Sequence, residues 1–140
     1  MESIKGTCRC GQLNYELNRS PVYAAYCHCT ECRQRNSSPC TSFIMGLQDS
    51  LTVFGQSDKY SEASGSGSTL DHHRCIKCGT VVYTRINRLN NIVAIPSATL
   101  LDEKHFQPVE HLWIQSKMPW LEIKDGLPQR AGPPKFPPGF

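Results

Sequence analysis

Three cysteines crowd into a six-residue stretch of this chain, 27-CHCTEC-32. In an extended segment, side chains two positions apart point to the same side, so Cys27 and Cys29 can reach one metal ion while His28 points away, toward the strand surface. A turn at 30–31 then brings in Cys32. Three protein ligands leave one position of a tetrahedral zinc ion open, which is the arrangement of a catalytic zinc site.

Cys40 is the one remaining cysteine that could be the fourth ligand and close the site. Cys40 follows Pro39 in an expected loop, with seven residues between it and Cys32. Closure by Cys40 would make the site structural, whereas an open position favours chemistry on a substrate. We favour the open site. A reactive Cys40 thiol in a redox or metal sensor is a further alternative.

A zinc ion held by three thiolates is electron-rich and a weak Lewis acid toward carbonyl groups. Such an ion would still bind an incoming thiol, lower its pKa and present it as a nucleophilic thiolate. This chemistry favours making or breaking carbon–sulfur bonds over hydrolysis of peptides or phosphates. Glu31, inside the cluster, is a candidate to move a proton, although a solvated turn carboxylate is the simpler interpretation.

The other four cysteines form two pairs that each end in glycine, 8-CRCG-11 and 75-CIKCG-79. A glycine directly after a ligand permits positive φ, so the backbone can turn sharply and aim neighbouring amides at the sulfur atoms. Two such turns face to face supply four thiolates, enough for a closed structural zinc site. A redox pair at Cys75 and Cys78 is the alternative, but the helix start and βαβ context that it needs are missing from the pattern.

These motifs resemble the glutathione-dependent formaldehyde-activating enzyme family, whose relatives include centromere protein V. The elements that carry the resemblance are G-x-C-x-C-G at 6–11, C-H-C-x-x-C-R at 27–33, C-x-x-C-G at 75–79 and K-x-P-W at 117–120, followed by D-G-L-P at 125–128. The resemblance covers roughly residues 4–130. It implies a mainly β chain with a β-tent fold, built of small antiparallel sheets organised around zinc.

The resemblance also implies the cofactor and the reaction. Two zinc ions per chain are expected, a structural one at Cys8, Cys10, Cys75 and Cys78 and a catalytic one at Cys27, Cys29 and Cys32. The family's named reaction joins formaldehyde to glutathione and is classed as a carbon–sulfur lyase. The expected partners are therefore a small-molecule thiol such as glutathione and an aldehyde.

The candidate substrate-binding residues are Arg33, Lys117 and Trp120. Arg33, with Lys117 behind it, is the candidate cation for glutathione carboxylates. Trp120 and Trp113 are candidate pocket walls, with a role as core aromatics as the alternative. Where the family has a Gly-Ser or Gly-Ala pair, this chain has 34-QRNSSPC-40, so the sequence leaves the actual thiol and aldehyde open.

Hydrophobic patterning predicts the elements that position these residues. Strands are expected at 12–17, 22–27, 41–45, 51–54, 81–86, 92–95 and 111–114, a short helix at 30–38, and a flexible hairpin loop or lid at 61–68. Residues 1–124 are expected to form one zinc-binding domain, followed by a Pro/Gly-rich tail at 125–140 that lacks regular structure.

Composition and charge argue against several other classes of protein. The net charge of +3 comes from scattered basic residues, which argues against nucleic-acid binding. The chain shows no secretory signal and no apolar run near the roughly 18 residues that span a bilayer, so we expect a cytoplasmic protein without a membrane partner. Eight cysteines in a reducing compartment favour metal binding over disulfides. The alternative to an enzyme is a non-catalytic binding module with two structural zinc sites, and homodimerisation is left open.

Overall fold

The computed structural model describes residues 2–65 and 67–135. Its strands are β1 (Ile4–Thr7), β2 (Asn14–Leu17), β3 (Tyr23–Cys27), β4 (Thr41–Leu47), β5 (Leu51–Phe54), β6 (Ser57–Ala63), β7 (Thr69–Cys75), β8 (Val81–Ile86), β9 (Ile92–Pro96) and β10 (His111–Leu112). Its helices are α1 (Thr30–Asn36) and the short 3-10 helices η1 (Gln48–Ser50), η2 (Ser97–Thr99), η3 (Glu103–His105) and η4 (Ile114–Ser116). The seven-residue α1 is the longest helix in the described part of the chain, and no helix there has the length and apolar character to cross a membrane.

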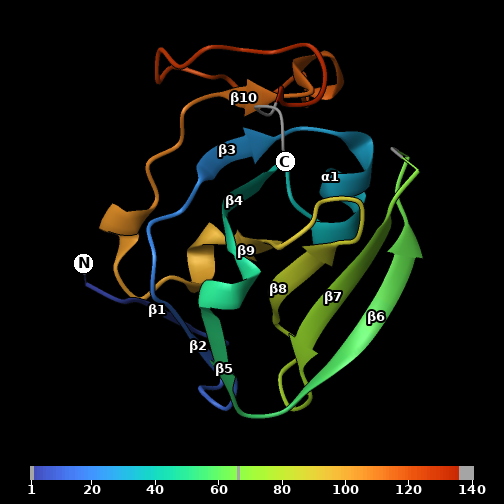
Figure 1. Ribbon diagram of the computed structural model, residues 1–140. Helices are drawn as coiled ribbons and strands as arrows, with labels where there is room; N and C mark the ends of the chain where they lie inside the picture. The colour runs from blue at the N-terminus through green and yellow to red at the C-terminus, as the bar shows by residue number, and fades with distance from the viewer. Residues whose placement is uncertain (1, 66, 136–140) are drawn as a thin grey trace.

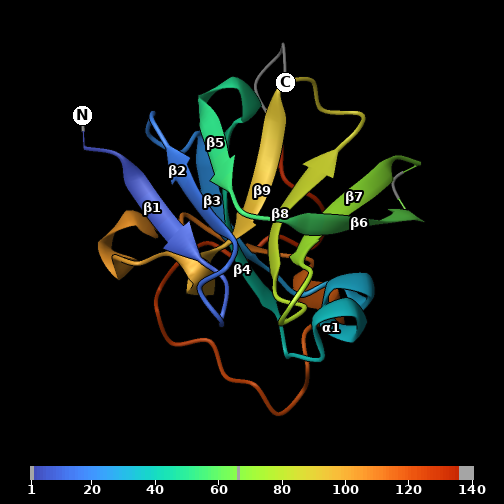
Figure 2. The ribbon, with the colours of Figure 1, turned by 90° about the horizontal axis from the view of Figure 1, so that it is seen from below.

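The strands form two sheets (Figures 1 and 2). Strands β1, β2 and β5 make a three-stranded sheet, and the larger sheet has the order β10-β3-β4-β9-β8-β7-β6. The paired strands run antiparallel, except that β10 lies parallel to β3. The mainly β fold of antiparallel sheets that the sequence resemblance implied is confirmed.

Most strands lie where the hydrophobic pattern predicted them. The patterns at 12–17, 22–27, 41–45, 51–54, 81–86, 92–95 and 111–114 correspond to β2, β3, β4, β5, β8, β9 and β10. The expected helix at 30–38 is α1, which ends because Ser37 adopts a left-handed conformation with φ of 50°.

Strands β1, β6 and β7 were not predicted. β6 reads SDKYSEA and is exposed along most of its length, so it offers no alternation of apolar and polar residues to detect. Residues 61–63 of the expected loop belong to this strand, and the connection to β7 is correspondingly short. Residue 66 of that loop, residue 1 of the expected domain and residues 136–140 of the expected tail lie outside the described residues.

The central strands β3, β4 and β9 send alternate side chains to two separate cores. Ala24 and Ala25 are neighbours in β3, yet Ala24 belongs to the first core and Ala25 to the second. Each core includes part of one cysteine group. Cys8 and Cys75 belong to the first core, and Cys27 belongs to the second. The period-two alternation of the central strands therefore separates the two candidate metal sites.

The segment after β10 has little regular structure but is hydrogen-bonded to that strand, which it surrounds in Figure 1. The His111 amide donates to the Pro128 carbonyl at 2.9 Å, and the Arg130 amide donates to the His111 carbonyl at 2.8 Å. The Trp113 amide donates to the Gly132 carbonyl at 3.1 Å. These bonds hold residues 125–132 against the end of the larger sheet.

The hairpin that leads to the first cysteine pair depends on a close contact at Gly6. Gly6 in β1 is paired with Tyr15 in β2, and a Cβ atom at position 6 would lie 2.0 Å from Cζ of Tyr15. Tyr15 is fully buried, and its hydroxyl lies 2.8 Å from Oγ1 of Thr99, so the ring has little room to move.

We therefore predict that Gly6→Ala destabilises the protein by about 1–3 kcal/mol, the usual effect of overpacking a well-filled core. Urea denaturation of the metal-loaded protein measures this change. Gly132→Ala is the matched control, because a Cβ atom there meets no other atom within 4 Å. Equal stability of the two variants would contradict the close packing of Tyr15 on Gly6.

Candidate metal centres

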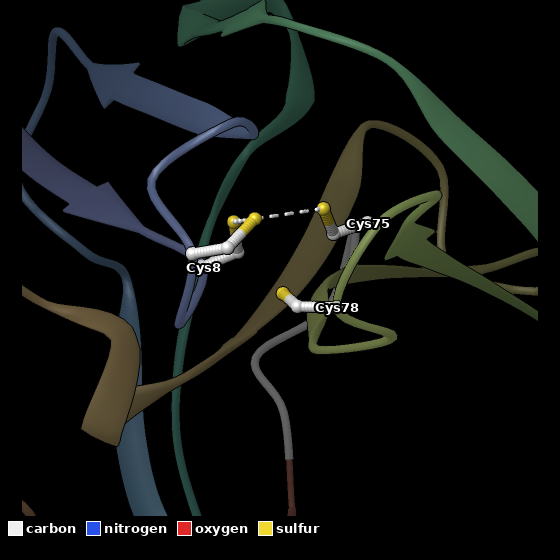
Figure 3. A group of neighbouring side chains, drawn as sticks. Cys8, Cys75 and Cys78 are labelled. Carbon is white, nitrogen blue, oxygen red and sulfur yellow. Dashed lines mark hydrogen bonds between the residues drawn. The ribbon is translucent and has the colours of Figure 1, made fainter.

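Four cysteines from the two sheets meet at one point (Figure 3). Cys8 and Cys10 lie in the connection between β1 and β2, whereas Cys75 ends β7 and Cys78 lies in the turn that follows. All four Sγ atoms lie within 4.8 Å of one another, and Sγ of Cys10 is 3.6 Å from Sγ of both Cys8 and Cys75. The structure therefore brings together the four residues that the sequence assigned to a structural site.

The glycine after each pair has the backbone conformation that the motif predicted. Gly11 has a φ of 84° and Gly79 a φ of 77°, both in the region that favours glycine. Amide groups point at the sulfur atoms: the Leu13 amide lies 3.2 Å from Sγ of Cys8, and the Lys77 amide lies 3.4 Å from Sγ of Cys75. These donors stabilise thiolates in the positions that a metal needs.

Other polar groups add to this stabilisation. The side-chain amide of Gln12 donates to Sγ of Cys75 at 3.1 Å. The Thr80 hydroxyl, 3.2 Å from Sγ of Cys78, lowers the pKa of that thiol to about 5, helped by the Thr80 amide. A thiol with such a pKa is ionised at neutral pH and ready to bind a metal.

The second group lies where β3 meets α1. Cys27 ends β3, Cys29 is the N-cap of α1, and Cys32 lies in the first turn of that helix. The three Sγ atoms lie within 4.8 Å of one another. The Cys32 amide donates to Sγ of Cys29 at 3.2 Å, so the helix start itself brings Cys32 to the other two cysteines. From the sequence, we had expected a turn at 30–31 to bring Cys32 to the other two cysteines.

The three thiols lie so close together that their pKa values diverge. Hydrogen bonds from Cys27 and Cys32 lower the pKa of Cys29 to about 2, with smaller contributions from the Cys32 amide and Arg35. Hydrogen bonding with Cys29 and Cys32, together with burial, raises the pKa of Cys27. The group by itself therefore favours one thiolate with protons on its neighbours, and a bound divalent cation supplies the charge that releases those protons.

Cys40 lies outside the second group, just before β4. Burial raises the pKa of its thiol, as expected for a cysteine without a charged partner. Within the described ranges, no fourth cysteine, histidine or carboxylate joins the three sulfur atoms. All eight cysteines are free of disulfides. The donor sets are thus four sulfurs and three sulfurs, and sulfur donors of this kind suit zinc, closed in the first case and open in the second.

A chain of hydrogen bonds that the sequence did not indicate runs to the residue between Cys27 and Cys29. His28, which we expected at the surface, is 1% exposed. Its Nε2 lies 2.9 Å from Nδ1 of His111, whose Nε2 lies 2.7 Å from a carboxylate oxygen of Asp125.

The carboxylate of Asp125 accepts from Nε2 of His111, and the second bond of the chain joins Nδ1 of His111 to Nε2 of His28. Nδ1 of His28 has no hydrogen-bond partner among the described residues. Burial, followed by the nearby His111 and Lys117, lowers the pKa of His28 and keeps its ring neutral. The chain ties the cysteine-bearing turn to residues 111 and 125.

Two of the three expected substrate-binding residues, Arg33 and Lys117, contact Met118 in the segment after η4. Nη1 of Arg33 donates to Sδ of Met118 at 2.6 Å, and Nζ of Lys117 donates to the Met118 carbonyl at 3.0 Å. Trp113 packs against the second core, to which Cys27 belongs. Trp120, in contrast, is 64% exposed.

Another arginine of α1, Arg35, comes closer to the sulfur atoms than the sequence suggested. Its Nη1 lies 4.0 Å from Sγ of Cys32. It also lines a cleft of about 460 Å³ between α1 and β6, whose walls are Glu31, Gln34, Arg35, Tyr60, Glu62 and Ala63. Arg35 stands three residues after Cys32, a spacing that places two side chains on one face of a helix, and this was the one signal that could have identified it.

The chain is similar to a known protein family and to a solved structure. The profile of a family described as "Glutathione-dependent formaldehyde-activating enzyme" matches residues 3–116. The crystal structure of a Rhodobacter sphaeroides protein is also similar, with a TM-score of 0.52 and 19% sequence identity. The match covers 90% of this chain and 98% of the Rhodobacter chain, and at this identity it concerns the fold alone. No curated protein matches the chain.

The position of Cys40 predicts that this residue is not needed for metal binding. Because Cys40 is not among the three sulfurs, Cys40→Ser should leave the number of zinc ions per chain unchanged, as measured by native mass spectrometry. Cys10→Ser is the comparison, since it removes one ligand of the four-sulfur group and should reduce both the zinc count and the melting temperature. Loss of one zinc ion from Cys40→Ser would mean that Cys40 closes the second site.

Proposed function

Since the chain belongs to the glutathione-dependent formaldehyde-activating enzyme family, we propose that it is a zinc-dependent carbon–sulfur lyase that acts on the adduct of a thiol and an aldehyde. The proposed adduct is S-hydroxymethylglutathione, formed from glutathione and formaldehyde or returned to them. The zinc ions number two per chain in this proposal, one at each cysteine group.

The observation that carries the proposal is the three-sulfur group without a fourth protein ligand among the described residues. A zinc ion bound there supplies positive charge at an open position, which lowers the pKa of a thiol that enters it. Cys27, Cys29 and Cys32 have the role of holding the ion. Cys8, Cys10, Cys75 and Cys78 have a structural role, because four thiolates leave no position for a substrate.

The reaction needs no oxidant or reductant. In the direction of synthesis, the thiol loses its proton, and a sulfur lone pair attacks the carbonyl carbon of formaldehyde to form the carbon–sulfur bond. The π electrons of the carbonyl move to its oxygen, which takes up one proton. The lyase direction reverses these steps. Glu31 is a candidate for the proton transfer, although its carboxylate also accepts a hydrogen bond from the Gly65 amide at 2.9 Å.

Two cations support an anionic substrate. In the described ranges, neither Arg33 nor Lys117 forms a salt bridge with a carboxylate, and each donates to neutral groups around Met118. We propose that they bind the carboxylates of glutathione and that Trp120, exposed three positions after Lys117, covers part of the bound thiol. The cleft beside Arg35 offers room for the remainder of the molecule.

Free thiols in both groups suit a reducing compartment, and we propose that the protein acts in the cytoplasm. We also propose that residues 1–124 form the catalytic domain. The tail would then contribute through Asp125, which holds the ring of His111 and, through it, His28.

The proposal predicts that the zinc-loaded protein accelerates the exchange of ¹³C-formaldehyde with S-hydroxymethylglutathione, measured by NMR exchange spectroscopy at equilibrium. Cys29→Ser should reduce the rate nearly to that of the uncatalysed reaction, because it removes a ligand of the open site. This variant should keep the four-sulfur zinc and a folded core, which circular dichroism and the zinc count verify.

A wild-type protein that holds two zinc ions but accelerates no exchange, with glutathione or with smaller thiols such as cysteine, would contradict the proposal. The alternative function, a zinc-stabilised binding module, would then account for both sites. Acceleration with a smaller thiol and not with glutathione would keep the reaction class but reject glutathione as the substrate.

A further inference from the structure

Arg35 connects the three-cysteine group to a different part of the fold. The residue lies on α1, and its side chain is about 21% exposed. Nη1 lies 4.0 Å from Sγ of Cys32, within reach of a hydrogen bond to sulfur. On the same side chain, Nε donates to Oε1 of Glu62 in β6. One guanidinium group therefore contacts a candidate metal ligand and a carboxylate at the same time.

The carboxylate of Glu62, which binds Arg35, is in turn hydrogen-bonded to a buried residue of the neighbouring strand β7, His72. Oε1 of Glu62 also accepts from Nε2 of His72 at 3.0 Å, and Nδ1 of His72 lies 2.8 Å from the Thr84 hydroxyl. His72 is buried, so these contacts cannot be exchanged freely for water. The chain of bonds crosses β8, β7 and β6 before it reaches α1.

The carboxylate of Glu62 is ionised in this environment. Burial opposes the ionisation of Glu62, but the hydrogen bonds from His72 and Arg35 outweigh it, and the pKa of Glu62 lies below its ordinary value. Glu62 is therefore a carboxylate at neutral pH, and its charge offsets that of Arg35 at a distance. The main effect of Arg35 on Cys32 is therefore the hydrogen bond that Nη1 donates to Sγ, and this bond depends on the position of the guanidinium group.

The two arginines of α1 differ in this respect. Arg33 points to Met118 and Thr30, and no hydrogen bond links it to a cysteine side chain. Arg35 alone on this helix combines a sulfur contact with an anchor outside the helix. A lysine could not replace it, because one ammonium group lacks the planar fork that serves two acceptors in fixed directions.

From this geometry we propose that Arg35 is a positioning residue of the three-cysteine centre, held by Glu62 and His72 so that it donates a hydrogen bond to the sulfur of Cys32. The donated bond withdraws electron density from that thiolate and reduces the excess negative charge of a three-thiolate metal site. The effect on catalysis rests on the proposed function. The effect on the metal site does not, because it can be observed without substrate.

The inference extends to the hairpin of β6 and β7, which lies beside α1 in Figure 1. Glu62 lies near the end of β6, and Gly65 beyond it donates to Glu31 of α1. The hairpin that the sequence suggested as a loop or lid thus supplies the anchor of the arginine. This interpretation explains why β6 is polar, because the carboxylate that holds Arg35 must come from this strand.

The test uses the full-length protein with cobalt(II) at both sites and compares the thiolate-to-cobalt charge-transfer bands of wild type and Arg35→Met. Loss of an N–H donor raises the energy of the sulfur lone pairs, so the bands from the three-sulfur site should move to longer wavelength. The cobalt affinity of that site should fall by about 10–100-fold, the usual effect of removing an outer-shell partner. Bands from the four-sulfur site should not move.

Three further variants separate the specific hydrogen bond from general effects. Arg35→Lys should resemble Arg35→Met, and Glu62→Leu should shift the bands in the same direction, because it frees the guanidinium. Arg33→Met is the matched control on the same helix and should leave the cobalt bands in place when no thiol is present. An unshifted spectrum in Arg35→Met, or a wild-type spectrum in Arg35→Lys, would overturn the proposal. Band shifts in a protein that proves inactive on thiol–formaldehyde adducts would support it and refute the proposed function separately.

Discussion

The four sulfur atoms of Cys8, Cys10, Cys75 and Cys78 meet where the two sheets come together, and in our proposal a zinc ion bound by them joins the sheets. Two of them come from the hairpin of the three-stranded sheet, one ends β7 in the larger sheet and one lies in the turn after β7. A chain of 140 residues with many short strands has a limited core, so a metal ion bound at this point would add substantially to its stability. In small zinc domains, the free energy of metal binding becomes folding free energy, on the order of 10 kcal/mol.

The separation of the two sulfur groups follows from the central strands. Because β3, β4 and β9 alternate between two cores, the four-sulfur group borders one core and Cys27 borders the other. In our proposal, the four-sulfur site is closed and structural, while the three-sulfur site keeps an open position. The three-sulfur group has contacts from distant segments, through His28 to residues 111 and 125 and through Arg35 to the β6–β7 hairpin. These contacts would act on the three-sulfur site without changing the four-sulfur site between the sheets.

The sequence predicted what depends on local spacing. Cysteines two or three residues apart were enough to assign seven of the eight cysteines to two groups, with the glycine after each pair of the first group as a second signal, and apolar alternation was enough for seven strands. It did not predict features that depend on tertiary pairing. His28 meets His111 because β10 runs parallel to β3, and no periodicity in the sequence indicates that pairing. Arg35 was overlooked in favour of Arg33 because its anchor, Glu62, lies in a polar strand that resembles a loop in sequence.

We would first test the open position of the three-cysteine group by ¹¹³Cd NMR of the protein with cadmium at both sites. The chemical shift of ¹¹³Cd depends strongly on the number of bound thiolates. We expect two resonances, one from a four-thiolate site and one from a site with three. Added glutathione should move the second toward the first and leave the first unchanged. Two resonances that both match four thiolates, and that glutathione does not move, would contradict an open position in the three-cysteine group.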